Sequence, residues 1–143
     1  MEKERREEMR LEIESLSENE EFARVVVAVF LSRLNPTLEE IDDVKTAVSE
    51  AVTNAVIHGY GGGGGKIRIL AAAEDGEFTV EISDRGAGIA DVKKAMEPMF
   101  TTDPSGERSG MGFSFMEAFM DQVEVISAPG QGTKVIMKKR IGA

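Results

Sequence analysis

The order of hydrophobic periodicities along the chain constrains its fold more than any other feature. Apolar and polar residues alternate over 9–14, as in a half-buried strand, and then recur at helical spacing twice before residue 59. Alternation returns around a Glu-Asp-Gly turn at 74–76, and a short helix is expected over 90–97. A helical pattern at 113–120 and strand patterns at 123–126 and 135–137 complete the chain. This β-α-α-β-β-α-α-β-β order predicts an α+β two-layer sandwich, with helices on one face of a mainly antiparallel mixed sheet.

Both long helices are predicted to begin with a capping box, in which glutamate follows a hydroxyl residue by three positions. Ser17 with Glu20 marks the first start, and Thr37 with Glu40 marks the second. The proline at position 36 should end the first helix near residue 35, and the second should run to about residue 58. The stripes expected to face the core are Phe22, Val25, Val26, Val29, Phe30 and Leu34 on the first helix, and Ile41, Val44, Val48, Ala51, Val52 and Ala55 on the second.

Composition limits the class of protein and its partners. The 143 residues suit one domain, 1–143, with its core in 8–143. A formal charge of −9 argues against direct binding to nucleic acid or anionic membranes and favours a basic partner. The absence of cysteine and the single histidine exclude a disulfide scaffold, thiol catalysis and nearly every zinc site. Without a membrane-length apolar run or a leader pattern, we expect a cytoplasmic protein.

The five consecutive glycines, 61–65, are similar in composition to a phosphate-binding loop but do not match its motif. Tyr60 stands where a P-loop needs glycine, and Ile67 stands where it needs serine or threonine. A dinucleotide motif would follow a strand and open a helix, whereas here a helix precedes the run and a strand follows it. We therefore interpret 61–65 as a flexible loop, and His58 as a helix-end residue favoured by the helix dipole.

Two groups of residues favour nucleotide chemistry. Glu50 and Asn54 lie four positions apart on the helix face opposite the core stripe, among small residues that would let a ligand approach; a plain solvated face is the alternative. The sequence Asp84-x-Gly86-x-Gly88 follows a strand. A carboxylate there can accept a hydrogen bond from an amine, and missing Cβ atoms let a flat ring lie against the backbone.

Two further groups lie near the carboxyl end of the chain. Gly110-x-Gly112 stands at a predicted helix start, where backbone amides attract phosphate, and Gly132-Thr133 opens the last strand. Each pattern is weak alone, and the last reads equally as a hairpin. Together, in this order and spacing, they resemble the ATP-binding boxes of the Bergerat-type fold shared by gyrase, MutL and sensor histidine kinases.

One branch of that superfamily is more similar. The segments NEEFARV (19–25), SEAVTNAVIHGY (49–60), FTT (100–102) and ERSGMGF (107–113) resemble the anti-sigma F factors, serine kinases of sporulating bacteria. The resemblance extends over nearly the whole chain beyond the first few residues. It implies an ATP- or ADP-binding domain with Mg²⁺, and it implies specific roles for residues in the four groups.

The implied roles divide between chemistry and binding. Asn54 would bind Mg²⁺ through its amide oxygen, and Glu50 would accept or orient the proton of an incoming serine hydroxyl. Asp84 would hold the adenine amine with support from Thr133, and Gly86 and Gly88 would flank the base. The implied ATP lid is 101–112, with contacts from Thr101, Thr102, Arg108, Ser109, Gly110, Met111 and Gly112. For Arg108, a surface arginine without contact to phosphate is the alternative.

The resemblance also implies protein partners. They are a sporulation sigma factor, which the protein would inhibit, and an anti-anti-sigma factor, whose serine it would phosphorylate. Glu20 and Arg24 match the family's partner-contact positions, although residues spaced four apart on a helix could equally form an exposed ion pair of little energetic value. A homodimer is implied as well, and the strand at 9–14 could pair with a second copy.

The sequence departs from the family in two places and leaves other functions open. Asp103 stands where relatives often carry a basic residue, and the glycine run replaces a loop that is usually polar. A module that binds nucleotide and sigma factor without transferring phosphate is one alternative, and a general-stress anti-sigma kinase is another. An isolated sensor histidine kinase domain is disfavoured, because the chain has no helical hairpin to carry a phosphorylated histidine.

Overall fold

The computed structural model describes residues 6–96 and 112–142 and confirms the predicted order of elements. The elements are β1 (Glu7–Glu14), α1 (Asn19–Leu31), a 3₁₀ turn (Ser32–Leu34), α2 (Leu38–Asn54), a π-helical turn (Ala55–Gly59), β2 (Lys66–Glu74), β3 (Glu77–Asp84), α3 (Val92–Ala95), α4 (Gly112–Phe119), β4 (Gln122–Ser127) and β5 (Thr133–Arg140). Within these ranges, no helix combines the length and apolarity needed to span a bilayer.

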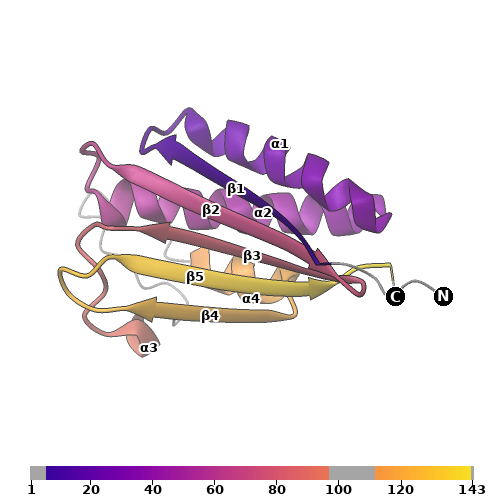
Figure 1. Cartoon of the computed structure of the whole chain (residues 1–143). Helices are drawn as coiled ribbons and strands as arrows, with labels where there is room; N and C mark the ends of the chain where they lie inside the picture. The colour runs from indigo at the N-terminus through magenta and orange to yellow at the C-terminus, as the bar shows by residue number, and fades with distance from the viewer. Residues whose placement is uncertain (1–5, 97–111, 143) are drawn as a thin grey trace.

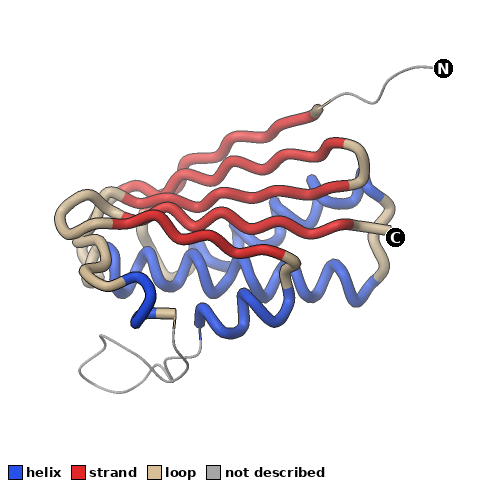
Figure 2. The backbone as a smooth tube through the Cα atoms, turned by 90° about the horizontal axis from the view of Figure 1, so that it is seen from below, coloured by secondary structure: helices blue, strands red, loops and turns tan. Residues whose placement is uncertain are grey.

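The strands form a single layer covered by helices on one side. The sheet has the order β1-β2-β3-β5-β4, and α1, α2 and α4 lie against the same face (Figures 1 and 2). This confirms the α+β two-layer sandwich. The sheet differs from the expected mixed sheet in one respect, because all pairings among the described strands are antiparallel. Strand β4 runs in the same direction as β3, but β5 lies between them, so no parallel pair forms.

The hydrophobic core lies between the helices and the sheet. Its largest fully buried side chains come from α1, α2, α4 and the three central strands; they include Leu31, Val44, Ile67, Ile69, Phe78, Ile82, Met116 and Met137. Alternation on β3 follows the predicted period of two, with Phe78, Val80 and Ile82 buried and the residues between them partly exposed. This packing holds the ends of β3 and β5 beside the end of α2, where the candidate site lies.

Helix α2 and the β2–β3 hairpin form as predicted. The hydroxyl of Thr37 accepts from the backbone N–H of Glu40 at 3.1 Å, and the Glu40 carboxylate accepts from the Thr37 N–H at 2.9 Å, which completes the capping box. In the hairpin turn, Asp75 and Gly76 have φ values of 51° and 77°. Both values are those of a two-residue turn matched to the strand twist.

Helix α1 differs from the prediction in its start and in its buried face. It begins at Asn19 after Glu18 with no side-chain cap, so the expected Ser17 and Glu20 capping box is wrong. Half of the expected stripe is also wrong, because Phe22, Val25 and Val29 are 51%, 47% and 66% exposed. Phe30 is buried as predicted, and Leu34 packs against the core. The buried residues are Ala23, Val27, Phe30 and Leu31. The helix is apolar on two sides, and periodicity alone does not decide which side faces the sheet.

Candidate functional site

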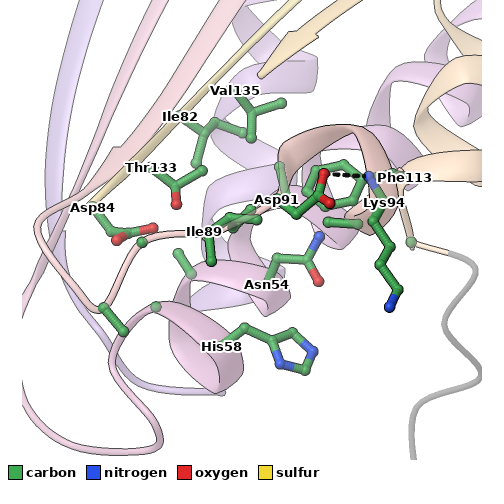
Figure 3. Close-up of a pocket in the computed structure, with 18 residues that line it drawn as sticks. Asn54, His58, Ile82, Asp84, Ile89, Asp91, Lys94, Phe113, Thr133 and Val135 are labelled. Carbon is green, nitrogen blue, oxygen red and sulfur yellow. Dashed lines mark hydrogen bonds between the residues drawn. The ribbon is translucent and has the colours of Figure 1, made fainter. Parts of the chain in front are cut away.

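A cavity of about 460 Å³ opens between the sheet and the carboxyl end of α2, a volume within the usual range for small-molecule sites. Its wall is formed by β3, β5, the π-helical turn, the loop after β3, α3 and the start of α4. Figure 3 shows the labelled side chains that surround it. The lining residues include Ala51, Asn54, Ala55, His58, Gly59, Ile82, Asp84, Ala87, Gly88, Ile89, Ala90, Asp91, Lys94, Ala95, Gly112, Phe113, Thr133 and Val135.

Asp84 and Thr133 form one end of this cavity (Figure 3). They are register partners at the ends of the antiparallel strands β3 and β5, so their side chains project on the same face of the sheet. The backbone N–H of Gly86 donates to Asp84 Oδ1 at 2.8 Å. Burial raises the pKa of the Asp84 carboxyl, and hydrogen bonds from the Gly86 and Thr133 amides oppose that rise. The result is a buried hydrogen-bond acceptor at the edge of an apolar cavity.

The loop after β3 is held on both sides by backbone hydrogen bonds. The N–H of Ala87 donates to the Gly59 carbonyl at 2.7 Å, and the Ala87 carbonyl accepts from the N–H of Gly130 at 2.7 Å. The hydroxyl of Tyr60 accepts from the N–H of Arg85 at 2.8 Å. These bonds connect the loop to the end of the π-helical turn and to the β4–β5 turn, so backbone contacts on both sides hold it at the cavity.

The loop also has a strict steric need for glycine. A Cβ at Gly86 would stand 1.9 Å from the Gly59 carbonyl oxygen, and a Cβ at Gly88, whose φ is +76°, would stand 2.0 Å from the Ala128 carbonyl oxygen. Gly88 lines the cavity, whereas Gly86 is not among the residues that line it. The missing Cβ atoms therefore make room for neighbouring backbone. Both glycines are needed for the fold itself, whether or not a flat ring lies against them.

Asn54, His58 and Lys94 stand around the other part of the cavity (Figure 3). Asn54 is the last residue of α2, and His58 lies in the π-helical turn that follows; such turns occur frequently at functional sites. The side chain of Asp91 accepts from the Lys94 N–H at 3.0 Å and thereby begins α3. Gly112 opens α4 beside Phe113 and also lines the cavity. Glu50 is half-buried one turn before Asn54 but does not line the cavity.

Several lining residues were not predicted as site residues. His58 was interpreted only as a helix end, although its spacing of four from Asn54 indicates the same helix face. Lys94 and Asp91 carry no signal beyond a short polar segment. Ile82 and Val135 were assigned to strands, but alternation alone could not show that their buried face borders a cavity.

The remaining predicted residues lie either away from the cavity or outside the described part of the chain. The glycine run 61–65 does not line the cavity, in agreement with its interpretation as a loop. Thr101, Thr102, Arg108, Ser109, Gly110 and Met111, and with them most of the expected lid, lie outside the described residues.

The cavity suits an adenine nucleotide. Its apolar walls at Ile82, Ile89 and Val135 can enclose a flat base. Asp84 offers an acceptor for an exocyclic amine of that base, and Asn54 offers an amide oxygen in the other part of the cavity, away from Asp84. Among residues 6–96 and 112–142 there is no group of three or more His, Asp or Glu side chains placed to hold a metal ion. A cation at Asn54 would therefore share its coordination with phosphate oxygens and water, as Mg²⁺ commonly does.

Comparison with known proteins agrees with this geometry. Residues 13–139 match the model of the histidine kinase-like ATPase domain. The chain is 61% identical over 132 residues to a protein named anti-sigma F factor from Clostridium acetobutylicum, covering 92% of each chain. It is 54% identical over 141 residues to one from Pasteuria penetrans, covering 97% of this chain and 94% of the relative. The chain belongs to the anti-sigma F factor family.

Two solved structures share the fold of this anti-sigma F family member. The catalytic domain of the histidine kinase ThkA aligns with a TM-score of 0.57 at 19% identity, over 93% of this chain and 96% of that one. Full-length ShkA in complex with AMPPNP aligns with a TM-score of 0.57 at 22% identity, over 71% of this chain and 22% of that one. At these identities the likeness shows the shared fold alone.

Proposed function

We propose that this protein binds Mg-ATP in the described cavity, inhibits a sporulation sigma factor, and phosphorylates a serine of an anti-anti-sigma factor in the cytoplasm. The observation that carries the nucleotide proposal is that polar groups stand at two separate ends of an otherwise apolar cavity. Asp84 and Thr133 supply acceptors at one end, while Asn54 supplies an amide oxygen at the other. The base would lie against Ile82 and Val135, and the phosphates would extend toward Asn54 and the amino end of α4.

Phosphoryl transfer needs positioning and charge neutralisation more than covalent chemistry by the protein. Asn54 would hold the Mg²⁺ ion, which neutralises phosphate charge when bound. The serine oxygen would attack the γ-phosphorus, its proton would pass to the Glu50 carboxylate, and ADP would leave. Thr101, Thr102, Arg108, Ser109, Gly110, Met111 and Gly112 are proposed to close over the phosphates.

The kinase proposal is tested by incubating the protein with Mg-ATP and its cognate anti-anti-sigma factor and measuring phosphoserine. Replacing a general base typically lowers the rate by about 10²- to 10⁴-fold, so Glu50→Gln should lose at least about 100-fold. Glu39→Gln makes the same change at an exposed position in the first turn of the same helix and should retain activity. Phosphoserine formed equally well by Glu50→Gln would remove the proposed role of Glu50.

The position of Glu50 outside the cavity lining favours one alternative. Since Glu50 does not line the described cavity, nucleotide binding could set the conformation of a sigma-binding module that transfers no phosphate. That alternative predicts sigma binding that depends on nucleotide and no phosphoserine under any condition. Detection of phosphoserine in the wild-type reaction decides between the two functions.

The proposed partner surface includes Glu20 and Arg24, which lie one turn apart on α1 and are half-buried. The exposed apolar side chains of Phe22 and Val25 lie on another side of the same helix and extend this surface outward. Large apolar side chains exposed together on one helix face are typical of protein contact sites. Arg24 approaches the Glu21 carboxylate only at 4.0 Å, and its buried Nε has no hydrogen-bond partner among the described residues. The Arg24 side chain is 38% exposed, so a partner carboxylate could pair with the accessible nitrogens of its guanidinium group.

Binding to the sigma factor tests this surface. Arginine at the centre of an interface often contributes 2 kcal/mol or more, so Arg24→Ala should weaken binding by roughly 30-fold or more. Arg68→Ala removes the same charge from an exposed position on β2, where Arg68 pairs with Glu12, and should leave binding nearly unchanged. Equal losses for the two variants would indicate a general charge effect in place of a specific contact.

A further inference from the structure

Three polar residues stand in one row across the sheet at the base end of the cavity. Asp84 is the register partner of Thr133, and Thr133 is the register partner of Ser127. The row therefore crosses β3, β5 and β4 at their common end, with Ser127 farthest from Asp84. Only Asp84 and Thr133 line the cavity. Ser127 can influence a ligand there only through its neighbours.

The hydroxyl of Ser127 has three partners. It lies 2.7 Å from the Gly132 carbonyl oxygen and 2.8 Å from Thr133 Oγ1, and it accepts from the backbone N–H of Ile89 at 2.8 Å. A hydroxyl has one proton to donate and two lone pairs that accept. The three contacts therefore use its full hydrogen-bonding capacity.

These contacts determine the atom to which the Thr133 hydroxyl donates its proton. The Gly132 carbonyl has no proton, so a 2.7 Å contact with it requires the proton of Ser127. The 2.8 Å contact between Ser127 and Thr133 then requires the proton of Thr133, since Ser127 has only one. With its proton directed at Ser127, Thr133 Oγ1 presents only lone pairs to the cavity.

We propose that Ser127 is a positioning residue that orients the Thr133 hydroxyl as an acceptor, so that the cavity selects a base with an amino group and disfavours a base with a carbonyl oxygen there. This inference rests on the proposed nucleotide binding. Thr133 and the Asp84 carboxylate then form one acceptor-only edge, which suits the amine of adenine. The 6-oxo group of hypoxanthine, which can only accept a hydrogen bond, would face two oxygens that also only accept. Polar groups left without a hydrogen-bond partner in this way are a strong source of specificity.

The test compares dissociation constants for ATP and ITP. Their bases differ at position 6, where adenine carries an amine and hypoxanthine an oxo group, and at N1, which carries a proton only in hypoxanthine. Wild-type protein should bind ATP more tightly than ITP. In Ser127→Ala the Thr133 hydroxyl can turn and donate to the 6-oxo group. The ITP-to-ATP ratio of dissociation constants should therefore fall by roughly 3- to 10-fold, the usual effect of one neutral hydrogen bond. Ser127→Thr keeps a hydroxyl with the same donor and acceptors and should restore the wild-type ratio.

A double-mutant cycle separates this role from a purely structural one. Ser127→Ala also removes the bonds to Ile89 and Gly132, but a loss of stability would weaken both nucleotides and leave their ratio unchanged. Thr133→Val should lower the ratio by itself, and adding Ser127→Ala to it should change the ratio no further. Thr133→Val also keeps the proposal testable if Ser127→Ala fails to fold.

The outcomes are distinct. A wild-type protein that binds ATP selectively, together with an unchanged ratio in either single variant, would overturn the role of Ser127 while preserving the proposed function. A wild-type protein that binds neither nucleotide would instead overturn the proposed function, and the inference with it. A lowered ratio in both single variants, without further loss in the double variant, is the result expected.

Discussion

Replacing Asp84 by asparagine separates the charge of this side chain from its shape. The Gly86 N–H donates to Oδ1 at 2.8 Å, and the amide oxygen of asparagine would keep that bond. Its NH₂ group would then face the cavity, where the carboxylate presents an acceptor. ATP loses a charge-assisted hydrogen bond worth about 1.5–3 kcal/mol, so its dissociation constant should rise by roughly 10- to 150-fold. ITP, whose 6-oxo group accepts a hydrogen bond, should lose far less.

The charge of Asp84 also predicts a pH dependence. Burial raises the pKa of this carboxyl in the ligand-free fold, so it becomes protonated at a higher pH than an ordinary aspartate. ATP affinity should therefore fall as the pH drops through that raised pKa, and Asp84→Asn should lack this dependence. The sign for stability is opposite. A raised folded pKa stabilises the fold at low pH, and this contribution is lost as the pH rises through it.

Isothermal titration calorimetry with ATP and ITP over a series of pH values measures both effects. Thermal unfolding without ligand serves as the control that the variant is folded. An ATP affinity in Asp84→Asn equal to that of the wild type would refute the placement of the amine at Asp84. A loss shared equally by ATP and ITP would refute the hydrogen-bond argument and indicate a general distortion of the loop.

Three other predictions follow from the packing, the caps and the charge. Gly88→Ala places a Cβ 2.0 Å from the Ala128 carbonyl oxygen at a residue with positive φ. It should lower the free energy of unfolding, measured in urea, by at least about 2 kcal/mol. Gly64→Ala, whose Cβ would have nothing within 4 Å, should leave the free energy of unfolding nearly unchanged. Thr37→Ala should cost about 1 kcal/mol in thermal unfolding, whereas Ser17→Ala should be neutral, and equal losses would contradict the observed caps. With a net charge of −9, association with a basic sigma factor should slow as salt rises in stopped-flow measurements; a flat dependence would argue against electrostatic attraction.

The predicted site residues and the cavity agree only in part, even where the residues are close together along the chain. Asp84 and Gly88 both line the cavity, but Gly86 between them does not, and Asn54 lines it while Glu50, one helical turn earlier, does not. The capping box at Thr37 was equally local and is confirmed. The box at Ser17 failed although its pattern is the same, because the chain leaves β1 through a turn that delays the helix until Asn19.

Residues distant in sequence were placed only by the tertiary structure. Ser127 reaches Ile89 and Thr133 because β4 pairs with β5 in one particular register, and register is not visible in alternation. Lys94 joins Asn54 and His58 only because α3, which packs near β4, forms another wall of the same cavity.

The sequence by itself determined the order of elements, the α+β class and the resemblance to the anti-sigma F factors, because periodicity and motif spacing are local properties of the chain. The tertiary structure decided which side of α1 is buried and why the glycines after β3 are needed. It also decided which side chains enclose the cavity. Those outcomes depend on how the helices cross the sheet and how its strands align, and these are contacts between segments far apart in the chain.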